Sequence, residues 1–410
     1  QLHEIDPAAW ARAAETGSLP ERVFVWENTP QQRLRMVRAS AKVYSHIANG
    51  SLFEDKWRLA LLQRATANPG AFLDSICLRG REEVEAWISA VSPEAAPEAA
   101  EAPRTTPPSS SSPVFTTGPA DTPPRAPSED GERHEPFPPV AATAAVVADP
   151  GATGLEDLWV LKDAEANGAG GIWVVSPSNR REVAARLHPA HRYVLQRYAP
   201  SPLLWHGKKF HVRVYVVVTA DLRVYIQRRA FLHVANKPFR MDGASVSDDE
   251  VHITNCCANS ANREAFAGEI VIDLPSDYPD AFESMKQALQ MLVDAAAPFL
   301  EAQTSHRYFE YMGCDFMVDT SGCAWLLECN CPPSQDSATG LPHAEGLHDA
   351  VIGDLLDLLV LPEVAGTDPT PGEWELVRPA QPGFGISQRT TSNTLRWGLF
   401  EKKALRARGY

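Results

Sequence analysis

Residues 314–330 read CDFMVDTSGCAWLLECN, and this pattern predicts a β-hairpin. Two apolar runs flank a Thr-Ser-Gly stretch, which is typical of a tight turn. If residues 321–322 form that turn, Asp315 lies directly opposite Glu328 on the partner strand. Side chains alternate between the two faces of a strand, so Asn330 points to the same side as Glu328. We therefore expect two carboxylates and one amide to converge at one end of the hairpin.

These three side chains suit a hard divalent cation. Carboxylate and amide oxygens are the ligands that Mg²⁺ prefers, and Mg²⁺ normally keeps waters and substrate phosphate oxygens as its remaining ligands. An exposed acidic hairpin is the alternative, but the neighbouring Phe316 and Trp325 indicate burial. We predict a magnesium site whose ligands are Asp315, Glu328 and Asn330.

A second period-2 pattern, over residues 209–216, separates polar from apolar residues on the two faces of a strand. The polar face carries Lys209, His211, Arg213 and Tyr215. The next strand is expected over residues 223–231, and a two-residue turn at 220–221 would place Arg213 opposite Arg228. Like charges in such a position repel unless an anion lies between them, so we expect an anion site. The alternative is that both arginines point into solvent.

A third motif combines a strand with a glycine-rich loop. Residues 159–162 read WVLK, and residues 167–172 read NGAGGI. Such a loop can cover phosphate oxygens with backbone N–H groups and one ammonium, although it matches neither the P-loop pattern nor a full GxGxxG. Together with the cationic and the acidic hairpin, it indicates a site for Mg-ATP.

Charge is distributed unevenly along the chain. The 410 residues have a formal net charge of −14, which argues against general binding of nucleic acid. Residues 190–241, however, contain ten Lys and Arg residues and one acid. This local field can hold a triphosphate and attract an acidic protein segment. No run of 18 apolar residues occurs, so no transmembrane helix is predicted.

The distribution of prolines separates one stretch of the chain from the segments that are expected to fold. Residues 93–150 hold 14 of the 34 prolines and are expected to be disordered, either as a flexible spacer or as a ligand for an SH3-type partner. Upstream, residues 30–73 are predicted to be helix-rich. Residues 158–361 alternate strand and helix patterns, including a helix over 282–300, as in α+β or α/β proteins. Residues 388–410 carry six basic residues and one acid, and we expect a solvated basic tail.

The seven cysteines favour a reducing compartment, because their number is odd and none stands at a spacing typical of zinc sites. We expect them to act as small apolar residues on strands. The chain begins at Gln1 and shows no charged-then-apolar leader, so a cytoplasmic location is expected and the true N-terminus is left open.

These motifs resemble the tubulin–tyrosine ligase-like family, a branch of the ATP-grasp fold. The matching segments, in chain order, are Leu161-Lys162 with its glycine-rich loop, Val194–Tyr198, Pro202–Leu204, Lys208–Tyr215, His252–Asn255, Asp315–Asp319 and Leu326–Ser334. A weaker match spans residues 47–57 and resembles the start of the family's central subdomain. This match would make the proline-rich stretch an insertion within that subdomain.

The resemblance implies an α+β, ATP-grasp architecture in four parts. These are a small N-terminal lobe (1–54), a central subdomain containing the insertion (55–198, with 93–150), a C-terminal subdomain with the Mg-ATP site (199–361) and a basic tail (362–410). The central and C-terminal subdomains would enclose ATP between them.

The resemblance also implies roles for individual residues. Nucleotide binding is expected for Lys162, Gln196, Arg197, Tyr198, Lys209, His211, His252 and Thr254, with residues 196–198 as the hinge that holds adenine. Catalytic roles are expected for Arg213, Arg228 and Asn255, and magnesium binding for Asp315, Glu328 and Asn330.

The chain departs from the family pattern at several positions. The family usually has aspartate where His211 stands and a basic residue where Gly168 stands, Ala169 replaces a loop glycine, and Cys256-Cys257 follows the His-Ile-Thr-Asn run. An imidazole offers at most one acceptor nitrogen, so it cannot receive an amine as a carboxylate does. The amino-acid substrate is therefore left open.

The resemblance implies a monomeric, ATP-dependent ligase that joins a free amino acid to tubulin or another acidic protein tail through an acyl phosphate. Cytoskeletal association would follow from a tubulin substrate. An inactive ATP-binding scaffold is the main alternative, and a small-molecule ATP-grasp ligase is the third. The absence of a His-Arg-Asp run disfavours a protein kinase.

Overall fold

The computed structural model describes ten stretches of the chain: residues 24–25, 43–47, 49–91, 158–166, 170–242, 245–259, 269–300, 308–333, 342–381 and 393–406. The proline-rich stretch 93–150 and the loop residues 167–169 lie outside them. The disorder expected of the proline-rich stretch therefore stays a prediction.

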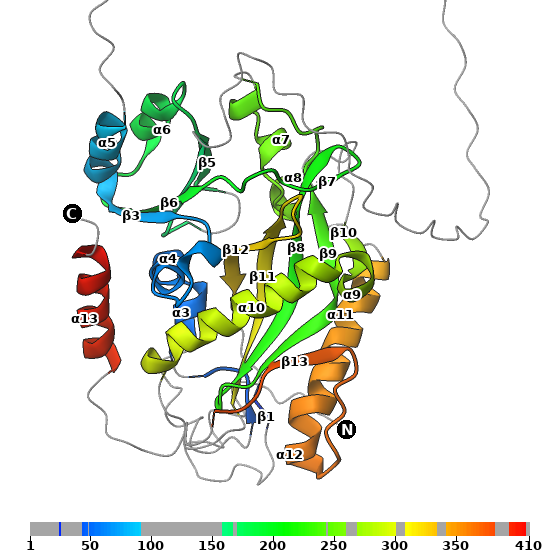
Figure 1. The fold of residues 1–410 in the computed structure, drawn as a ribbon. Helices are drawn as coiled ribbons and strands as arrows, with labels where there is room; N and C mark the ends of the chain where they lie inside the picture. The colour runs from blue at the N-terminus through cyan, green and yellow to red at the C-terminus, as the bar shows by residue number, and fades with distance from the viewer. Residues whose placement is uncertain are drawn as a thin grey trace, which may run out of the picture.

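A seven-stranded antiparallel sheet forms the body of the molecule (Figure 1). Its main path runs β10-β9-β8-β11-β12, while β13 pairs with β9 and β7 pairs with β8. The strands are β7 (Leu204–Trp205), β8 (Lys208–Thr219), β9 (Val224–Val234), β10 (Glu269–Asp273), β11 (Phe309–Val318), β12 (Ala324–Asn330) and β13 (Trp374–Arg378).

The β11–β12 hairpin pairs Asp315 with Glu328, as predicted, but by a different route. Its loop holds three residues, 320–322, and ends in Gly322 with a φ of 82°. This longer loop shifts the register by one residue relative to a two-residue turn. A β-bulge beyond Asp315 shifts the register back, so the two carboxylates still face each other.

The β8–β9 hairpin also has a three-residue loop, 220–222, in which Leu222 adopts a φ of 65°. A register shift between Val214 and Val216 then places Arg213 opposite Phe231. The expectation that Arg213 faces Arg228 is therefore wrong. In this hairpin the longer loop and the bulge shift the register in the same direction. In the β11–β12 hairpin they shift it in opposite directions and cancel.

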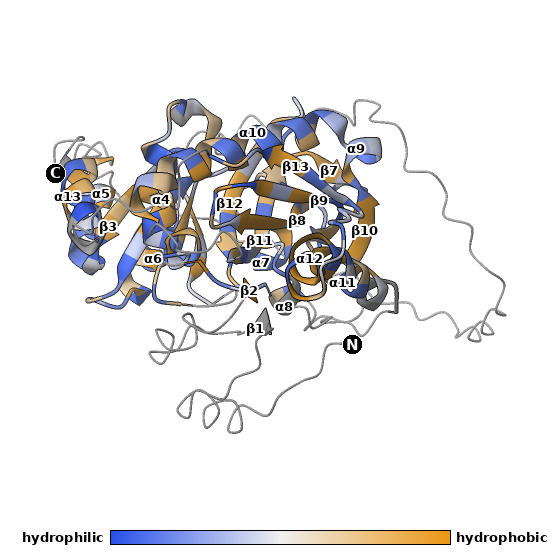
Figure 2. Ribbon diagram, turned by 90° about the horizontal axis from the view of Figure 1, so that it is seen from below, coloured by the Kyte–Doolittle hydropathy of each residue, from blue (hydrophilic) through white to orange (hydrophobic). Residues whose placement is uncertain are grey.

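Helices cover both faces of this sheet (Figure 2). On one face, α10 (Pro279–Ala296) contributes apolar residues spaced by three or four positions, including Met285, Leu289 and Leu292. On the other face, α11 (Pro342–Leu355) buries Leu347, Val351 and Leu355. A helix was predicted over 282–300, and the structure confirms it in this region.

The second helix layer changes the interpretation of β8. Tyr215 and Val217 are buried in the cluster beneath α11, so the predicted polar face of the strand is polar only near residues 209–213. The candidate site therefore occupies one end of the sheet rather than a whole face.

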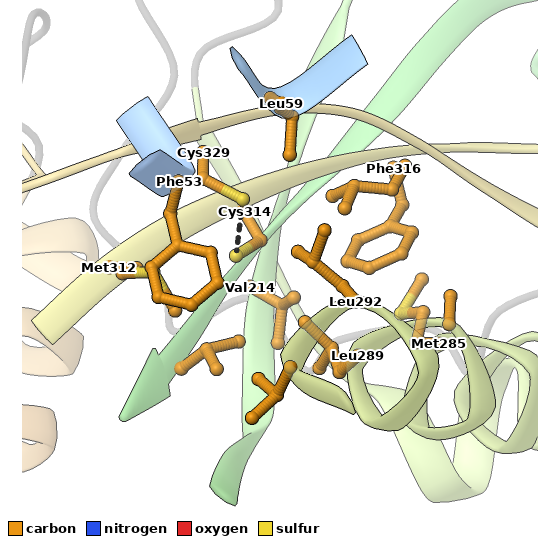
Figure 3. Packing of buried hydrophobic residues seen from close by; sticks show 14 of the residues in the cluster. Phe53, Leu59, Val214, Met285, Leu289, Leu292, Met312, Cys314, Phe316 and Cys329 are labelled. Atoms are coloured by element: carbon orange, nitrogen blue, oxygen red, sulfur yellow. Dashed lines mark hydrogen bonds between the residues drawn. The ribbon is translucent and has the colours of Figure 1, made fainter. Parts of the chain in front are cut away.

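Figure 3 shows the core between α10 and the sheet. Cys314 and Cys329 face each other across β11 and β12, with their sulfur atoms 3.4 Å apart. Both are almost fully buried, as are Cys77 and Cys331. Burial raises the pKa of the Cys77 thiol to about 12. These four cysteines confirm the expectation that cysteines act as small apolar residues.

A smaller sheet packs beside the first. Its order is β3-β6-β4-β5, with β3 (Ser75–Arg79), β6 (Arg192–Arg197), β4 (Trp159–Asp163) and β5 (Ile172–Val175). The helices α5 (Gly80–Ala90) and α6 (Arg180–Arg186) cover one face, where Leu161, Tyr193 and Leu195 are buried. The alternate residues of β4 and β6, including Lys162 and Gln196, therefore point toward the other face.

Short elements complete the described chain: β1 (Phe24–Val25), β2 (Val43–Tyr44), α3 (Ser51–Glu54), α4 (Lys56–Arg64), η1 (Pro69–Ala71), η3 (Ser245–Ser247), α7 (Asp249–His252), α8 (Cys256–Asn259), α9 (Leu274–Asp277), η4 (Ala297–Phe299), η5 (Leu356–Val360), α12 (Leu361–Ala365) and α13 (Asn393–Arg406). Strands β1 and β2 pair in parallel. No helix in the described ranges has both the length and the apolar character needed to span a bilayer.

The expectation of a solvated basic tail is wrong for the described C-terminal residues. Strand β13 joins the main sheet, and α13 buries Trp397 against Phe299 and Phe400. Helix α13 also lies beside α4, where Trp57 donates a hydrogen bond to Glu401 (3.0 Å). Arg396, Lys402 and Lys403 are exposed on the other side of this amphipathic helix, which the charge count alone did not reveal. The four domain boundaries stay a prediction.

Candidate active site

A cavity lies between the two sheets and joins most of the predicted site residues. The small sheet contributes residues of β4, β5 and β6, and the main sheet contributes residues of β8, β11 and β12. Predicted residues that line it are Lys162, Gln196, Arg197, Tyr198, Lys209, His211, His252, Thr254, Asn255, Asp315 and Glu328. Lining residues as far apart in the chain as Leu73 and Glu328 thus share one cavity.

Lys162 spans the two sheets. Its ammonium donates to the Gln196 side-chain oxygen (2.9 Å) and to the Leu327 backbone carbonyl (3.1 Å). Burial lowers the pKa of Lys162, while the nearby Glu328 opposes the shift. A buried ammonium with so few partners is well suited to an anionic ligand.

Lys209 forms a second cationic position. Its ammonium donates to the His252 backbone carbonyl (2.9 Å) and lies 4.2 Å from the centre of the Tyr198 ring. Burial, reinforced by repulsion from Lys162, lowers the pKa of Lys209 to about 7. This lysine is therefore poised to gain a proton when an anion enters the cavity.

Two neutral histidines line the same wall. His211 Nδ1 lies 2.7 Å from the Thr254 hydroxyl, and His252 Nδ1 lies 2.8 Å from the Tyr198 hydroxyl. Burial lowers the pKa of both rings to about 3, helped by Arg213 for His211 and by Lys209 for His252. Nε2 of His211 lies 3.6 Å from Oδ1 of Asp315, so this ring faces the carboxylate.

The carboxylates lie at the polar end. Asp315 is bound by Arg213 through both oxygens: Nε contacts Oδ1, and Nη2 donates to Oδ2 over 2.9 Å. Glu328 lies across the strand pair, and the Asn330 amide donates to its Oε1 (3.5 Å). Asp315 and the other groups around Arg213 raise the pKa of its guanidinium despite burial. Arg213 is therefore bound to Asp315 and is not among the residues that line the cavity.

This donor set fits a hard cation. Each carboxylate oxygen has two lone pairs, so Asp315 keeps acceptor capacity beside Arg213. Glu328 also keeps acceptor capacity, and the Asn330 amide leaves its carbonyl oxygen available. Among the described residues no cluster of three or more His, Cys, Asp or Glu side chains could hold a metal. A cation here would depend on two carboxylates, an amide oxygen and groups supplied by substrate.

The other end of the cavity is apolar, and the sequence reasoning did not identify it. Its wall is formed by Leu73, Val160, Ile172, Val174, Ala199, Met317 and Leu327. Val160 could have been found, because it lies two residues before Lys162 on the same strand face. Leu73 lies outside the strands, so no alternation in the sequence indicated that it lines the cavity.

Besides Arg213, two predicted positions are not brought into this cavity. Arg228 lies in the irregular part of β9, and its Nε is 3.8 Å from a carboxylate oxygen of Glu373. Asn330 is not among the lining residues, although it follows Glu328 on β12. The glycine-rich loop is described only at its flanks, and Gly171 there adopts a φ of 82°.

Comparison with known proteins identifies the family. The model of the tubulin-tyrosine ligase family matches residues 142–367, which is more than half of the chain. The chain belongs to this family. The matched residues include β4 and β8, which carry the two lysines, and β11 and β12, which carry the two carboxylates.

The relatives include a probable tubulin polyglutamylase, TTLL9, of Bos taurus, which is 30% identical over 168 residues, covering 36% of this chain and 34% of the relative. A probable tubulin–tyrosine ligase, PBY1, of Saccharomyces cerevisiae is 29% identical over 159 residues, covering 34% of this chain and 21% of the relative. The chain thus matches between a fifth and about a third of these relatives' length.

A solved structure supports the fold. The C-terminal domain of K. lactis Pby1, described as an ATP-grasp enzyme that interacts with the mRNA decapping enzyme Dcp2, aligns with a TM-score of 0.52. The alignment covers 87% of each chain at 17% identity. The predicted α+β, ATP-grasp fold is therefore confirmed.

Proposed function

We propose that this chain is an ATP-dependent ligase that forms an amide bond between a carboxylate and an amine. The observation that carries this proposal is the cavity itself. It joins an apolar slot to two buried lysines and two carboxylates, within a fold of the ATP-grasp type.

The apolar end suits adenine, and the hinge residues 196–198 would border it. Lys162 and Lys209 would contact the phosphates, because both ammonium groups are buried and face few protein acceptors. A bound anion favours the charged form of both lysines and so opposes the effect of burial on their pKa values. The His211 and His252 rings also line the cavity and would border the nucleotide.

Asp315, Glu328 and Asn330 would hold Mg²⁺, which when bound supplies Lewis-acid polarisation of phosphoryl oxygens. Arg213 holds the Asp315 carboxylate in a fixed orientation through its two contacts. The protein thereby positions charge near the phosphoryl group, which is the main task in phosphoryl transfer.

The proposed reaction has two steps. A carboxylate oxygen attacks the γ-phosphorus of ATP, and ADP leaves with the electrons of the broken P–O bond. An amine nitrogen then attacks the acyl carbon, the C–O bond to phosphate breaks, and the amine loses a proton. Amide, ADP and inorganic phosphate are the products.

The carboxylate donor is expected to be an acidic protein segment, and the amine donor a free amino acid. Residues 190–241 supply a strongly cationic region that would attract such a segment. The curated relatives include a probable tubulin polyglutamylase and a probable tubulin–tyrosine ligase, so tubulin is the first acceptor to try.

The test is incorporation of labelled amino acids. Purified protein, Mg-ATP and a panel of amino acids are combined with tubulin or with acidic peptides, and label in the acceptor is measured. Wild type should incorporate label, and Glu328→Gln should reduce incorporation by at least about a hundredfold, as expected on removal of a metal ligand. Equal, background-level labelling by both proteins would contradict ligase activity toward those acceptors.

One observation favours a second candidate, an ATP-binding scaffold. Arg213 contacts both oxygens of Asp315 and so competes with a cation for this carboxylate. A scaffold would bind ATP in the same assay without incorporation, whereas the ligase would show both.

A further inference from the structure

A second cavity lies on the helix-covered side of the small sheet. Trp87 of α5 and Trp159 of β4 form its apolar wall, with ring centres 5.5 Å apart in an edge-to-face arrangement. Arg180 at the start of α6 and Arg197 at the end of β6 supply charged groups. Trp159 and Arg197 are cross-strand partners, and the guanidinium lies 4.3 Å from the ring centre.

This cavity is cationic as well as aromatic. None of the described residues that line it is acidic. Arg180 makes one long contact there, from Nη1 to the Val91 carbonyl (3.4 Å). Indole rings pack well against proline in an extended chain, and guanidinium groups bind carboxylates. The lining therefore fits a polypeptide that is rich in both proline and acidic residues.

The chain itself provides such a polypeptide at this place. The described residues stop at Val91 and resume at Leu158, and both Val91 and Trp159 line the cavity. Residues 92–157, which connect them, contain fourteen prolines and eleven acidic residues against three basic ones. Both ends of this acidic segment are thus anchored at a site of opposite charge.

We propose that this cavity is the docking site for the chain's own proline-rich acidic segment, residues 92–157. Tethering at both ends gives the segment an effective concentration of order millimolar, so weak contacts with two indoles and two arginines suffice for docking. This inference goes beyond the proposed ligase function and does not depend on it.

Docking at this cavity would contact the strand that borders the nucleotide. Arg197 lies between Gln196 and Tyr198, and all three also line the candidate active site. Successive residues of β6 point to opposite faces, so one strand serves both cavities. The docked segment would thereby hold the hinge strand from its outer side.

Limited proteolysis of the full chain tests the proposal. The segment contains trypsin sites at Arg104, Arg125 and Arg133, and cleavage at each is followed by mass spectrometry. Arg180→Glu should accelerate cleavage in the segment by about fivefold or more, because cleavage follows the population of the undocked form. Arg181→Glu is the matched control, since Arg181 is exposed, adjacent and absent from the cavity lining.

A second variant changes residues of the segment itself and leaves the cavity residues unaltered. Neutralising Glu129, Asp130, Glu132 and Glu135 to glutamine should also accelerate cleavage at Arg104, which is remote from the changes. Unfolding curves in urea establish that each variant is folded. Wild-type rates for Arg180→Glu and for the quadruple variant would overturn the proposal. Protection that grows with protein concentration would also overturn it, because the occupant would then be a second copy.

Discussion

Lys209 is 6% exposed, and among the described residues its ammonium contacts a carbonyl and an aromatic ring, so its charge depends strongly on what enters the cavity. Period-2 alternation predicted that Lys209 and His211 share one strand face and that Asp315 and Glu328 share another, while only the combination of motifs indicated that the two hairpins form one site. It did not reveal the Arg213–Asp315 pair, because pairing between β8 and β11 joins segments about a hundred residues apart. The predicted position of Arg228, opposite Arg213, was wrong because no residue propensity signals a β-bulge.

The lowered pKa of Lys209, about 7, predicts opposite pH dependences for two quantities. Above pH 7 the free protein loses this proton, whereas the nucleotide complex retains it. Nucleotide affinity should therefore fall as pH rises from 7 to 9, by up to about tenfold per pH unit, and binding should take up a proton. Calorimetric titration in buffers of different ionisation enthalpy measures both.

The free energy of unfolding should depend on pH in the opposite direction. The unfolded state binds the Lys209 proton up to about pH 10.5, so the Lys209 contribution to the free energy of unfolding should rise between pH 7 and that value. Lys209→Met should flatten both dependences, while Lys208→Met, at the less buried neighbour, should leave them unchanged. An unchanged slope in Lys209→Met would rule out this lysine as the titrating group.

At the scale of elements, strands and the long helix α10 were predictable from periodicity, and loop length was not. Both hairpins use a three-residue loop that ends at a positive φ, at Leu222 and Gly322. Ala-Asp and Ser-Gly are equally acceptable in shorter turns, so the sequence could not select the loop length. The Asp315–Glu328 pairing was predicted correctly only because the register shift at the bulge cancels the shift caused by the longer loop.

Gly322 tests this hairpin geometry. A Cβ atom at this residue would lie 2.9 Å from the Asp280 Cβ atom, at a φ of 82°. Gly322→Ala should lower the free energy of unfolding by about 1–3 kcal/mol. Gly353→Ala, in α11 with open space around it, should instead raise that energy by about 0.5–1 kcal/mol. Urea unfolding distinguishes the two, and equal effects would refute the assigned loop.

Helix α13 provides the test of the corrected C-terminal segment. Trp397 is 9% exposed and packs against Phe299, so Trp397→Ala should lower the free energy of unfolding by about 3 kcal/mol. Leu399, on the same helix, is 63% exposed, and Leu399→Ala should change that energy by less than about 0.5 kcal/mol. A solvated tail would show small effects for both variants.

At the scale of the whole molecule, the acidic total of −14 coexists with a cavity whose cationic groups come from both sheets. The fold class was predictable, since the family motifs occur in order along the chain. The apolar slot was not, because its residues come from both sheets and from loops between strands, so only the three-dimensional arrangement brings them together.

Binding of an acidic acceptor should depend on salt at this scale. Most of the basic residues in the cationic stretch 190–241 are partly exposed, and salt screens such charges over about 8–10 Å. Affinity for an acidic peptide should fall at least about tenfold between 50 and 300 mM salt, measured by fluorescence anisotropy. A neutral peptide of equal length should show no such fall, and equal salt dependence would show that charge does not guide acceptor binding.

The central claim, amide formation through an acyl phosphate, is tested most directly by isotope transfer. Acidic peptide or tubulin with ¹⁸O in its carboxylates is incubated with Mg-ATP, the amino-acid panel and the protein, and the released phosphate is analysed by mass spectrometry. Because the acyl C–O bond breaks in the second step, each amide formed should release one phosphate with a single ¹⁸O atom. Unlabelled phosphate alongside amide, or no phosphate above the Glu328→Gln control, would contradict the account.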